Sequence, residues 1–250
     1  MTALRHVAAL YDIHGNLPAL EAVLAEIAKE QVDLIVIGGD VFPGPMGVEV
    51  MLLLSSLETP VTYIRGNGDR ETLAARAGAV SATLPPPVQE VMRWCASTMT
   101  EPIAERVQQW PATTTLAVDG LGDVLFCHAT PLDDTTIVTK RTSDADVTQH
   151  FGGASARTVV CGHTHMPYDR QIGNMRIVNA GSVGMPFADP GAYWLMLGPG
   201  VELRKTPYDF SAAALRIEQS DYPEAATFAA TSITHPPSEA AMLDRFTALT

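Results

Sequence analysis

Residues 6–40 read HVAALYDIHGNLPALEAVLAEIAKEQVDLIVIGGD, two apolar runs on either side of a stretch with helical spacing. The first run, 6–12, predicts a buried strand. In residues 17–31 apolar side chains recur every three or four positions, which predicts a helix. The second run, 33–40, is unbroken and ends in glycines, as expected of a strand buried on both faces. The order strand, helix, strand predicts a parallel, layered α/β sheet.

The same alternation continues toward the middle of the chain. A second helix is predicted at about 47–57, and the next strand with its loop is VTYIRGNGD at 61–69. The segment 71–110 is helical in character and is broken by LPPP at 84–87. Its large side chains favour core packing, with a cap over a substrate as the alternative. These side chains are Met92, Trp94, Met99 and Trp110.

The second half of the chain reads mostly as hairpins. Two strands joined by a glycine turn are predicted in 113–129, and RTVVCGHTH at 157–165 is a strand that leads into a loop. Hairpins are predicted at 170–183, turning near Gly173-Asn174, and at 192–209, turning at Gly198–Gly200. A short helix is expected at 238–248.

Length and composition fit one α/β domain with a large core, or at most two small domains. A chain of 250 residues, 46% hydrophobic and 18% charged, fits a single domain over 1–250. Within it we expect a helical cap at about 78–110 and a tail at about 220–250. No apolar stretch approaches the roughly 20 residues that span a bilayer, so no membrane partner is expected. The opening MTALRHVAAL lacks a basic cluster and a cleavage site, so it is interpreted as a first buried strand rather than a signal peptide.

The net charge of −12 argues against binding to a nucleic-acid polymer or an anionic membrane. A site for phosphate would therefore need local positive charge, from metal ions or a few arginines. The three cysteines, Cys95, Cys127 and Cys161, form no CxxC pair. They fit free thiols in a reducing cytoplasm better than a disulfide framework.

Five loops share one pattern, because each follows an apolar strand and carries side chains that can bind metal. These side chains are Asp12 and His14, Asp40, Asn67, His128, and His163 with His165. In a parallel α/β sheet such loops gather at the carboxyl edge of the strands, where these folds place ligands. Four of the seven histidines lie in these loops; His6, His150 and His235 lie elsewhere and are interpreted as bystanders.

The predicted ligands are oxygen and nitrogen atoms without a thiolate, which suits Mn, Fe, Zn, Co or Ni better than Mg or Ca. Seven side chains exceed the needs of one ion. Two divalent ions roughly 3.5–4 Å apart, bridged by one carboxylate, would use them all.

The ordered set Asp12-x-His14, Gly39-Asp40, Gly66-Asn67-x-Asp69, His128 and Gly162-His163-x-His165 resembles the motifs of calcineurin-like metallophosphoesterases. The resemblance spans roughly residues 8–185. A single motif of this kind carries little information, whereas the complete ordered set is specific. The resemblance implies a four-layer α/β/β/α sandwich with two mixed sheets and metal loops at the carboxyl rim of the strands.

The resemblance also implies a role for each motif residue. Asp12, His14 and His165 would bind the first ion, and Asn67, His128 and His163 the second. Asp40 would bridge them, and a hydroxide held by the two metals, most favourably Mn, would attack phosphorus. Asp40, Asn67 and His128 would thus be catalytic as well as metal-binding.

The sequence departs from the family pattern at Gly68, where many members have a histidine that assists the leaving group. General acid catalysis is typically worth about 10²–10⁴-fold, so we expect a preference for good leaving groups. The GD motif, GDVFPG at 39–44, also lacks the acidic residue that many protein phosphatases carry nearby. Both departures favour a small phosphodiesterase-like enzyme, as in a compact prokaryotic subgroup that lacks the histidine.

Several neighbouring residues have two interpretations each. Arg70 is a candidate phosphate clamp and the fourth predicted catalytic residue, or it pairs with a carboxylate such as Glu71. Asp69 is expected to order the loop. Asn16 is expected to cap a helix, with a substrate contact as the alternative. Ser182 is expected to be a turn residue, with the same alternative.

The predicted function is hydrolysis of a small phosphodiester or phosphomonoester with two divalent metal ions. The same metals could serve a dinucleoside polyphosphate hydrolase or a protein phosphatase. A different class of function, a non-catalytic scaffold on the same fold, is disfavoured because no predicted ligand is missing. The sequence leaves the physiological substrate, the native metal and homo-oligomerisation open.

Overall fold

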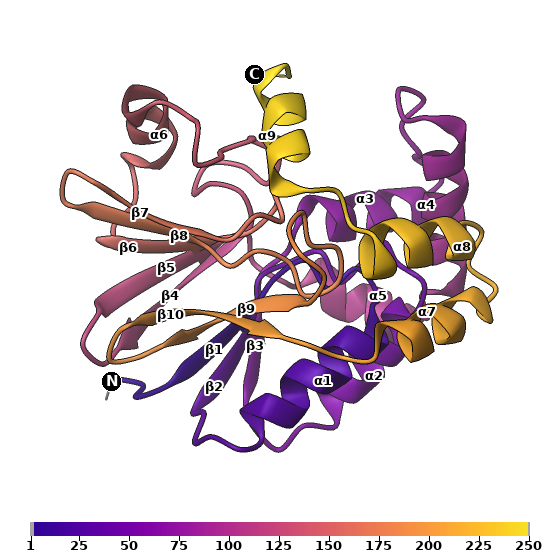
Figure 1. Ribbon diagram of the computed structural model, residues 1–250, viewed down its shortest axis with the longest axis horizontal. Coiled ribbons are helices and arrows are strands. Elements are labelled where there is room, and N and C mark those ends of the chain that lie inside the picture. Colours follow the sequence, from indigo (N-terminus) through magenta and orange to yellow (C-terminus); the bar gives the residue numbers. More distant parts are fainter. Residues whose placement is uncertain (1–2, 250) are drawn as a thin grey trace.

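Two five-stranded mixed β-sheets face each other in the computed structural model, which describes residues 3–249 (Figure 1). The ends of the predicted 1–250 domain, residues 1–2 and 250, lie outside the described residues. Helices cover the outer faces of both sheets, so the chain forms the predicted four layers. None of the helices within residues 3–249 combines the length and apolar character that crossing a membrane requires.

The first sheet has the strand order β10-β9-β1-β2-β3. Its parallel strands are β1 (Val7–Leu10), β2 (Leu34–Ile37) and β3 (Val61–Tyr63). The hairpin of β9 (Ala192–Leu197) and β10 (Val201–Thr206) joins β1 in antiparallel orientation. The crossovers are made by α1 (Leu17–Ile27) and α2 (Gly47–Ser55). The predicted βαβ start and the second hairpin are confirmed.

The second sheet has the order β4-β5-β6-β8-β7, with β5, β6 and β8 parallel. Its strands are β4 (Thr113–Val118), β5 (Gly122–Cys127), β6 (Thr158–Cys161), β7 (Tyr168–Ile172) and β8 (Met175–Asn179). The hairpin of β7 and β8 confirms the predicted turn near Gly173-Asn174. Helix α6 (Asp144–Phe151) covers the outer face of this sheet.

Alternation along the strands builds three buried layers. In β1, Val7 and Ala9 point into the cluster between the sheets, whereas Ala8 and Leu10 pack against α1 and α2. This period of two is the ordinary geometry of a strand, and here both faces are covered. All three cysteines are buried free thiols, as predicted.

Between β3 and β4 the chain forms α3 (Asn67–Arg76), α4 (Pro86–Thr98) and α5 (Glu101–Gln108). Helix α3 begins earlier than the sequence indicated, at the predicted ligand Asn67. Met92, Met99 and Trp110 are buried, which confirms core packing for these side chains. Trp94 is half-buried and meets the ring of Tyr222 edge-on at 5.4 Å.

The C-terminal segment folds back over the carboxyl ends of the strands as four short helical elements (Figure 1). They are α7 (Phe210–Glu218), α8 (Ala225–Phe228), the π-helix η1 (Ala229–Thr234) and α9 (Glu239–Thr247). Only α9 was predicted. The tail gave weak signals because alanine and threonine are frequent in it. Helices α7, α8 and η1 pack with α4, whereas α9 packs against Met166 and Phe187.

Candidate metal centre

Seven polar side chains converge where the parallel strands of both sheets end. They follow β1 (Asp12, His14), β2 (Asp40), β3 (Asn67), β5 (His128) and β6 (His163, His165). Because carboxyl ends of parallel strands share one edge, residues distant in sequence meet there. The Nε2 atoms of His14 and His165, 151 positions apart, lie 3.3 Å from each other. The structure therefore brings together all seven predicted ligands.

Asp40 lies between the two halves of this cluster. Its Oδ1 accepts a hydrogen bond from the N–H of Gly68 at 2.7 Å, which fixes the carboxylate. Its Oδ2 lies 3.6 Å from Nε2 of His14 and 3.5 Å from Nε2 of His128. One carboxylate oxygen thus faces imidazoles of both predicted ligand groups, as a bridging ligand should.

Asp12 provides a direct test of whether the site fits a cation. Its Oδ2 accepts a hydrogen bond from the N–H of His163 at 2.9 Å. Its Oδ1 has no hydrogen-bond partner among the described residues, and the side chain is completely buried. That atom lies 3.4 Å from Nε2 of His165 and 3.8 Å from Nε2 of His128. An orphaned carboxylate oxygen is costly to bury, and a cation at this point would compensate for it.

The histidine rings are held in orientations that suit metal binding. Three rings place Nδ1 against a backbone carbonyl: His14 on Pro43 (3.0 Å), His128 on Gly38 (3.0 Å) and His165 on Met185 (2.7 Å). His163 is reversed, with Nε2 3.1 Å from the carbonyl of Thr135. A ring that donates from one nitrogen presents the lone pair of the other, so these carbonyls orient the inward nitrogen as a ligand.

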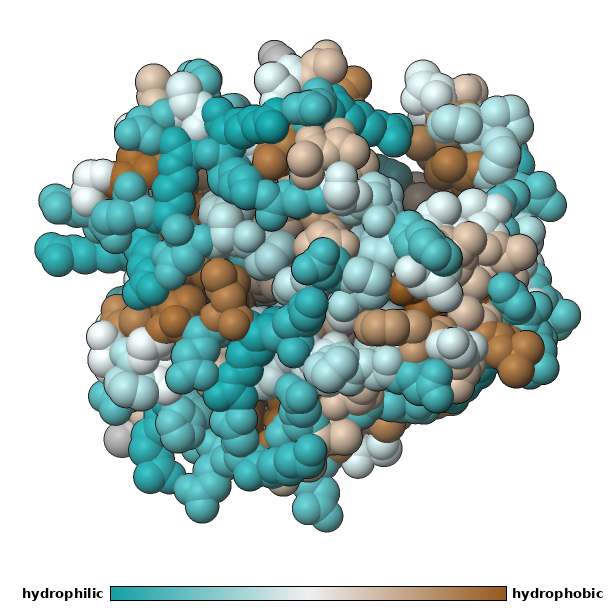
Figure 2. Space-filling model, in the orientation of Figure 1, coloured by the Kyte–Doolittle hydropathy of each residue, from teal (hydrophilic) through white to brown (hydrophobic). Residues whose placement is uncertain are grey.

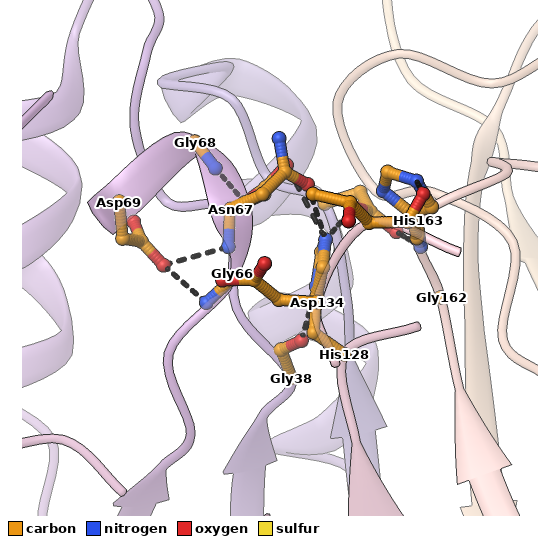
Figure 3. A network of polar contacts seen from close by, with 12 residues as sticks. Gly38, Gly66, Asn67, Gly68, Asp69, His128, Asp134, Gly162 and His163 are labelled. Atoms are coloured by element: carbon orange, nitrogen blue, oxygen red, sulfur yellow. Dashed lines mark hydrogen bonds and ion pairs between the residues drawn. The ribbon is translucent and has the colours of Figure 1, made fainter. Parts of the chain in front are cut away.

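Asn67 turns its amide oxygen toward two ring nitrogens (Figure 3). Oδ1 lies 3.2 Å from Nε2 of His128 and 3.0 Å from Nδ1 of His163. Without a cation, the reversed amide would make better hydrogen bonds to both rings. Of the two amide orientations, the one with the oxygen inward is the one that could bind a divalent cation, because oxygen rather than amide nitrogen binds such ions.

Asp69 ties the loop after β2 to the start of α3, as predicted. Its buried carboxylate accepts hydrogen bonds from the backbone N–H groups of Asp40 (2.8 Å), Phe42 (3.0 Å) and Gly66 (3.0 Å). Figure 3 shows this side chain turned away from the histidines and toward Gly66. Asp69 therefore positions two predicted ligands without facing the centre itself.

The ligand loops adopt unusual backbone conformations. Five non-glycine residues among the described ones have a positive φ, and all five are predicted ligands. They are Asp12 (53°), His14 (46°), Asp40 (54°), His163 (65°) and His165 (57°). The left-handed region costs a non-glycine residue about 1–2 kcal/mol and is concentrated at functional sites. The loops thus aim these side chains inward at the expense of stability.

Burial and neighbouring charges shift the pKa values of the clustered carboxyls and histidines in opposite directions. Burial disfavours the ionised carboxyls, but the neighbouring histidines outweigh it and hold the pKa of Asp12 and Asp40 below the usual range. Burial also disfavours protonated imidazole and lowers the pKa of His163 to about 4. At His128 the carboxylate of Asp40 overcomes burial and raises the pKa to about 10. The metal-free cluster therefore holds protons where cations would bind.

Arg70 does not line the ligand cluster. It makes two hydrogen bonds to the carboxylate of Asp134, at 2.7 and 2.9 Å, and lies 3.7 Å from a carboxylate oxygen of Glu71. This pairing is the alternative considered from the sequence. The phosphate-clamp role of Arg70 stays a prediction that would require the guanidinium to leave Asp134.

Two other residues that had two interpretations from the sequence have structural roles. Asn16 caps α1, since its Oδ1 accepts a hydrogen bond from the N–H of Ala19 at 3.2 Å, and the residue is fully buried. Ser182 is also fully buried, and its hydroxyl donates to the carbonyl of Asp12 at 2.7 Å. Both contacts agree with the expected cap and turn.

Gly68 occupies a position with no room for a side chain. A Cβ there would lie 2.4 Å from the carbonyl oxygen of Phe42 and 2.8 Å from Cδ of Pro43. The loop after β2 therefore fills the space into which a histidine at this position would point. Installing a histidine at position 68 would displace that loop, so the residue cannot simply be restored.

Sequence reasoning missed the carbonyl groups of Gly38, Pro43, Thr135 and Met185 that hold the four rings. Every residue carries a carbonyl, so no side-chain pattern marks these positions. It also missed Asp134, which engages Arg70.

Comparison with known proteins agrees with this geometry. The family model described as the calcineurin-like phosphoesterase superfamily domain matches residues 6–197. No curated protein matches the sequence. Similar solved structures include the hypothetical protein PH1004 from Pyrococcus horikoshii OT3, with TM-score 0.77 and 18% identity over 94% of this chain and 100% of that chain.

Two further solved structures share the fold. A metallophosphoesterase from Sphaerobacter thermophilus has TM-score 0.70 and 22% identity, over 93% of this chain and 100% of that chain. Vacuolar protein sorting 29 from Cryptosporidium parvum has TM-score 0.51 and 12% identity, over 82% of this chain and 98% of that chain. At these identities the similarity establishes the architecture.

Proposed function

The chain belongs to the calcineurin-like phosphoesterase superfamily, and on that premise we propose that it hydrolyses phosphate esters with two divalent cations. The observation that carries the proposal is the convergence of seven predicted ligand side chains at the carboxyl ends of the strands, among them Asp12, whose Oδ1 has no hydrogen-bond partner among the described residues. The superfamily uses divalent metals, and this arrangement leaves a buried anionic oxygen for a cation to satisfy.

We assign the ligands to two groups, with Asp12 also lying near Asp40 and His128. Asp12, His14 and His165 lie within mutual reach and would hold the first ion. Asn67, His128 and His163 would hold the second, since the Asn67 oxygen faces both rings. Asp40 would serve both ions, because its Oδ2 lies between His14 and His128. Mixed oxygen and nitrogen ligands favour Mn²⁺, with Fe, Zn, Ni or Co as alternatives.

Bound divalent cations would polarise the phosphoryl oxygens and lower the pKa of an attacking water. The chain itself supplies positioning. Backbone carbonyls that contact the outward ring nitrogens hold the histidine rings in place. Asp69 holds the loops of Asp40 and Asn67 together. A site with its ligands fixed before substrate arrives loses little energy to reorganisation during the reaction.

The completeness of the ligand set favours an enzyme over a non-catalytic scaffold. All seven predicted ligands are present, and five of them are kept in strained backbone conformations. A protein that served only as a binding module would gain stability by losing that strain.

Turnover of chromogenic esters tests the proposal. Protein loaded with Mn²⁺ should hydrolyse bis-p-nitrophenyl phosphate or p-nitrophenyl phosphate, and Asp40→Asn should abolish turnover while the protein stays folded. Asp123→Asn, the same change at an exposed position on β5, is the matched control and should be fully active. Absence of turnover with Mn, Ni, Co, Fe and Zn, in protein shown to hold metal, would refute the proposal.

A further inference from the structure

A cavity of about 740 Å³ extends outward from the candidate metal centre. Five of the seven predicted ligands form its floor: His14, Asp40, Asn67, His163 and His165. Figure 2 shows a hollow between the tip of α4 and α9, bordered by brown apolar surface beside α4. Whatever ester group is attached to the reacting phosphate must occupy this space.

One apolar wall of the cavity begins directly at a predicted ligand. The ring of Phe187 stacks on the ring of His165, with centroids 4.8 Å apart and an interplanar angle of 27°. Phe246 of α9 continues this surface, 6.1 Å from Phe187 between centroids. Met185, whose carbonyl orients His165, also lines the cavity. A substrate at the centre would therefore contact aromatic surface immediately beside its phosphate.

A second apolar wall is built from a small hydrophobic core. Val91 of α4 packs with Tyr222 and Phe228, and all three side chains line the cavity. The rings of Tyr222 and Phe228 lie 6.0 Å apart, nearly perpendicular to each other. Because core packing fixes these side chains, the wall exists before substrate binds.

Charge in the cavity is poorly suited to a polyphosphate. No lysine or arginine within residues 3–249 lines it, and Glu224 adds a negative charge to its rim. Arg70, the predicted clamp, is bound to Asp134. A phosphate beyond the one held at the centre would therefore be desolvated without a cationic partner, which is costly.

Two residues of the second apolar wall, Tyr222 and Phe228, lie beyond residue 197, where the match to the family model ends. Thr231 and Ser232 line the cavity from the π-helix η1. Such helices are rare and are often found at functional sites. The cavity therefore combines residues inside the family match, such as Val91, with residues of the C-terminal segment.

We propose that the substrate is an ester of a single phosphate group with a hydrocarbon group, which the cavity accepts between Phe187 and the Val91–Tyr222–Phe228 wall. This inference rests on the proposed hydrolase function. It disfavours dinucleoside polyphosphates, which would place several charged phosphates against apolar side chains.

A homologous series of diesters tests it: p-nitrophenyl alkyl phosphates from methyl to octyl, which share one leaving group. With Mn²⁺-loaded protein, kcat/KM should rise about two- to fourfold for each methylene that the cavity buries, until the cavity is filled. The hexyl ester should also exceed diadenosine tetraphosphate in kcat/KM.

Val88→Asp provides the variant. Val88 lines the cavity at the first turn of α4, is 37% exposed, and tolerates an acidic residue because the helix N-terminus favours one. This variant should lose the dependence of kcat/KM on chain length. Leu203→Asp is the same type of change at a 45% exposed position on the edge strand β10. This control should keep the dependence of kcat/KM on chain length.

The outcomes separate the two proposals. Failure to hydrolyse any ester would refute the hydrolase function itself. Hydrolysis of the methyl ester with a flat or falling chain-length series would overturn only the hydrocarbon inference. So would a preference for the polyphosphate, or an unchanged series in Val88→Asp.

Discussion

At the scale of single residues, the predicted ligands combine unfavourable backbone with unfavourable burial. Asp12 has a φ of 53° and a buried oxygen without a hydrogen-bond donor among the described residues. Neither feature stabilises the folded state of the metal-free protein. Both are explained if the residue is selected to hold a cation, because binding to the folded state then compensates for the strain.

The strain at His163 can be measured without metal. Its φ of 65° suits glycine, so His163→Gly should be more stable than His163→Ala by about 1 kcal/mol. Both variants lose the same imidazole and its contact with Thr135, so their difference isolates the backbone. Urea unfolding in the presence of a chelator measures it. Equal stability, or a more stable alanine variant, would contradict the account of strain.

Metal binding should release protons. Burial opposes protonation of His128, but Asp40 raises its pKa to about 10, so at pH 6–8 a cation must displace a proton from this ring. His163, with a pKa of about 4, releases none in that range. Protons compete with the cation more strongly as pH falls. For each proton displaced, the affinity for Mn²⁺ should therefore decrease about tenfold for each unit by which the pH is lowered.

Calorimetric titration of the metal-free protein with Mn²⁺, in two buffers of different ionisation enthalpy, measures both the affinity and the protons released. An affinity that is constant between pH 6 and 8 would contradict this assignment.

At the scale of elements, the start of α3 and the loop after β2 form one unit. Asp69 accepts three backbone hydrogen bonds across this junction, and Asp40 accepts one from Gly68. From the sequence we expected Gly68 only to remove from this position the side chain with which many members assist the leaving group. The structure shows that the loop occupies that position, so the absence of the histidine reflects packing.

The junction predicts a cost for any side chain at Gly68. Gly68→Ala places a Cβ 2.4 Å from the carbonyl oxygen of Phe42, so we expect a loss of about 1–3 kcal/mol in unfolding free energy and weaker metal binding. Gly153→Ala is the matched control, because a Cβ there meets no atom within 4 Å. Chemical denaturation and metal titration compare the two variants. If both behave alike, the close packing at Gly68 is not significant.

The sequence predicted the strands and the early helices because their periodicity is strong. Residues 17–31 have a clear helical pattern and residues 33–40 a clear strand pattern. The structure confirms α1 in the first range and β2 in the second. It did not predict α7, α8 or η1. These short elements are stabilised by contacts with α4, and such contacts are not encoded in local propensity.

At the scale of the whole molecule, the two sheets bring five loops to one point and the C-terminal segment covers it (Figure 1). The candidate ligands could be selected from sequence because metal binding restricts the residue type at each position. The cavity walls could not, because any apolar residue can form them and their neighbours are decided by tertiary packing. The substrate inference therefore depends on structure, whereas the metal inference can be made from sequence.

The central claim is that seven side chains hold two divalent cations in this fold. Anomalous diffraction from crystals loaded with Mn²⁺ tests it most directly. We predict two peaks: one bound by Asp12, His14 and His165, the other by Asn67, His128 and His163, with Asp40 contacting both. A single peak, or peaks away from these residues at saturating Mn²⁺, would contradict the account.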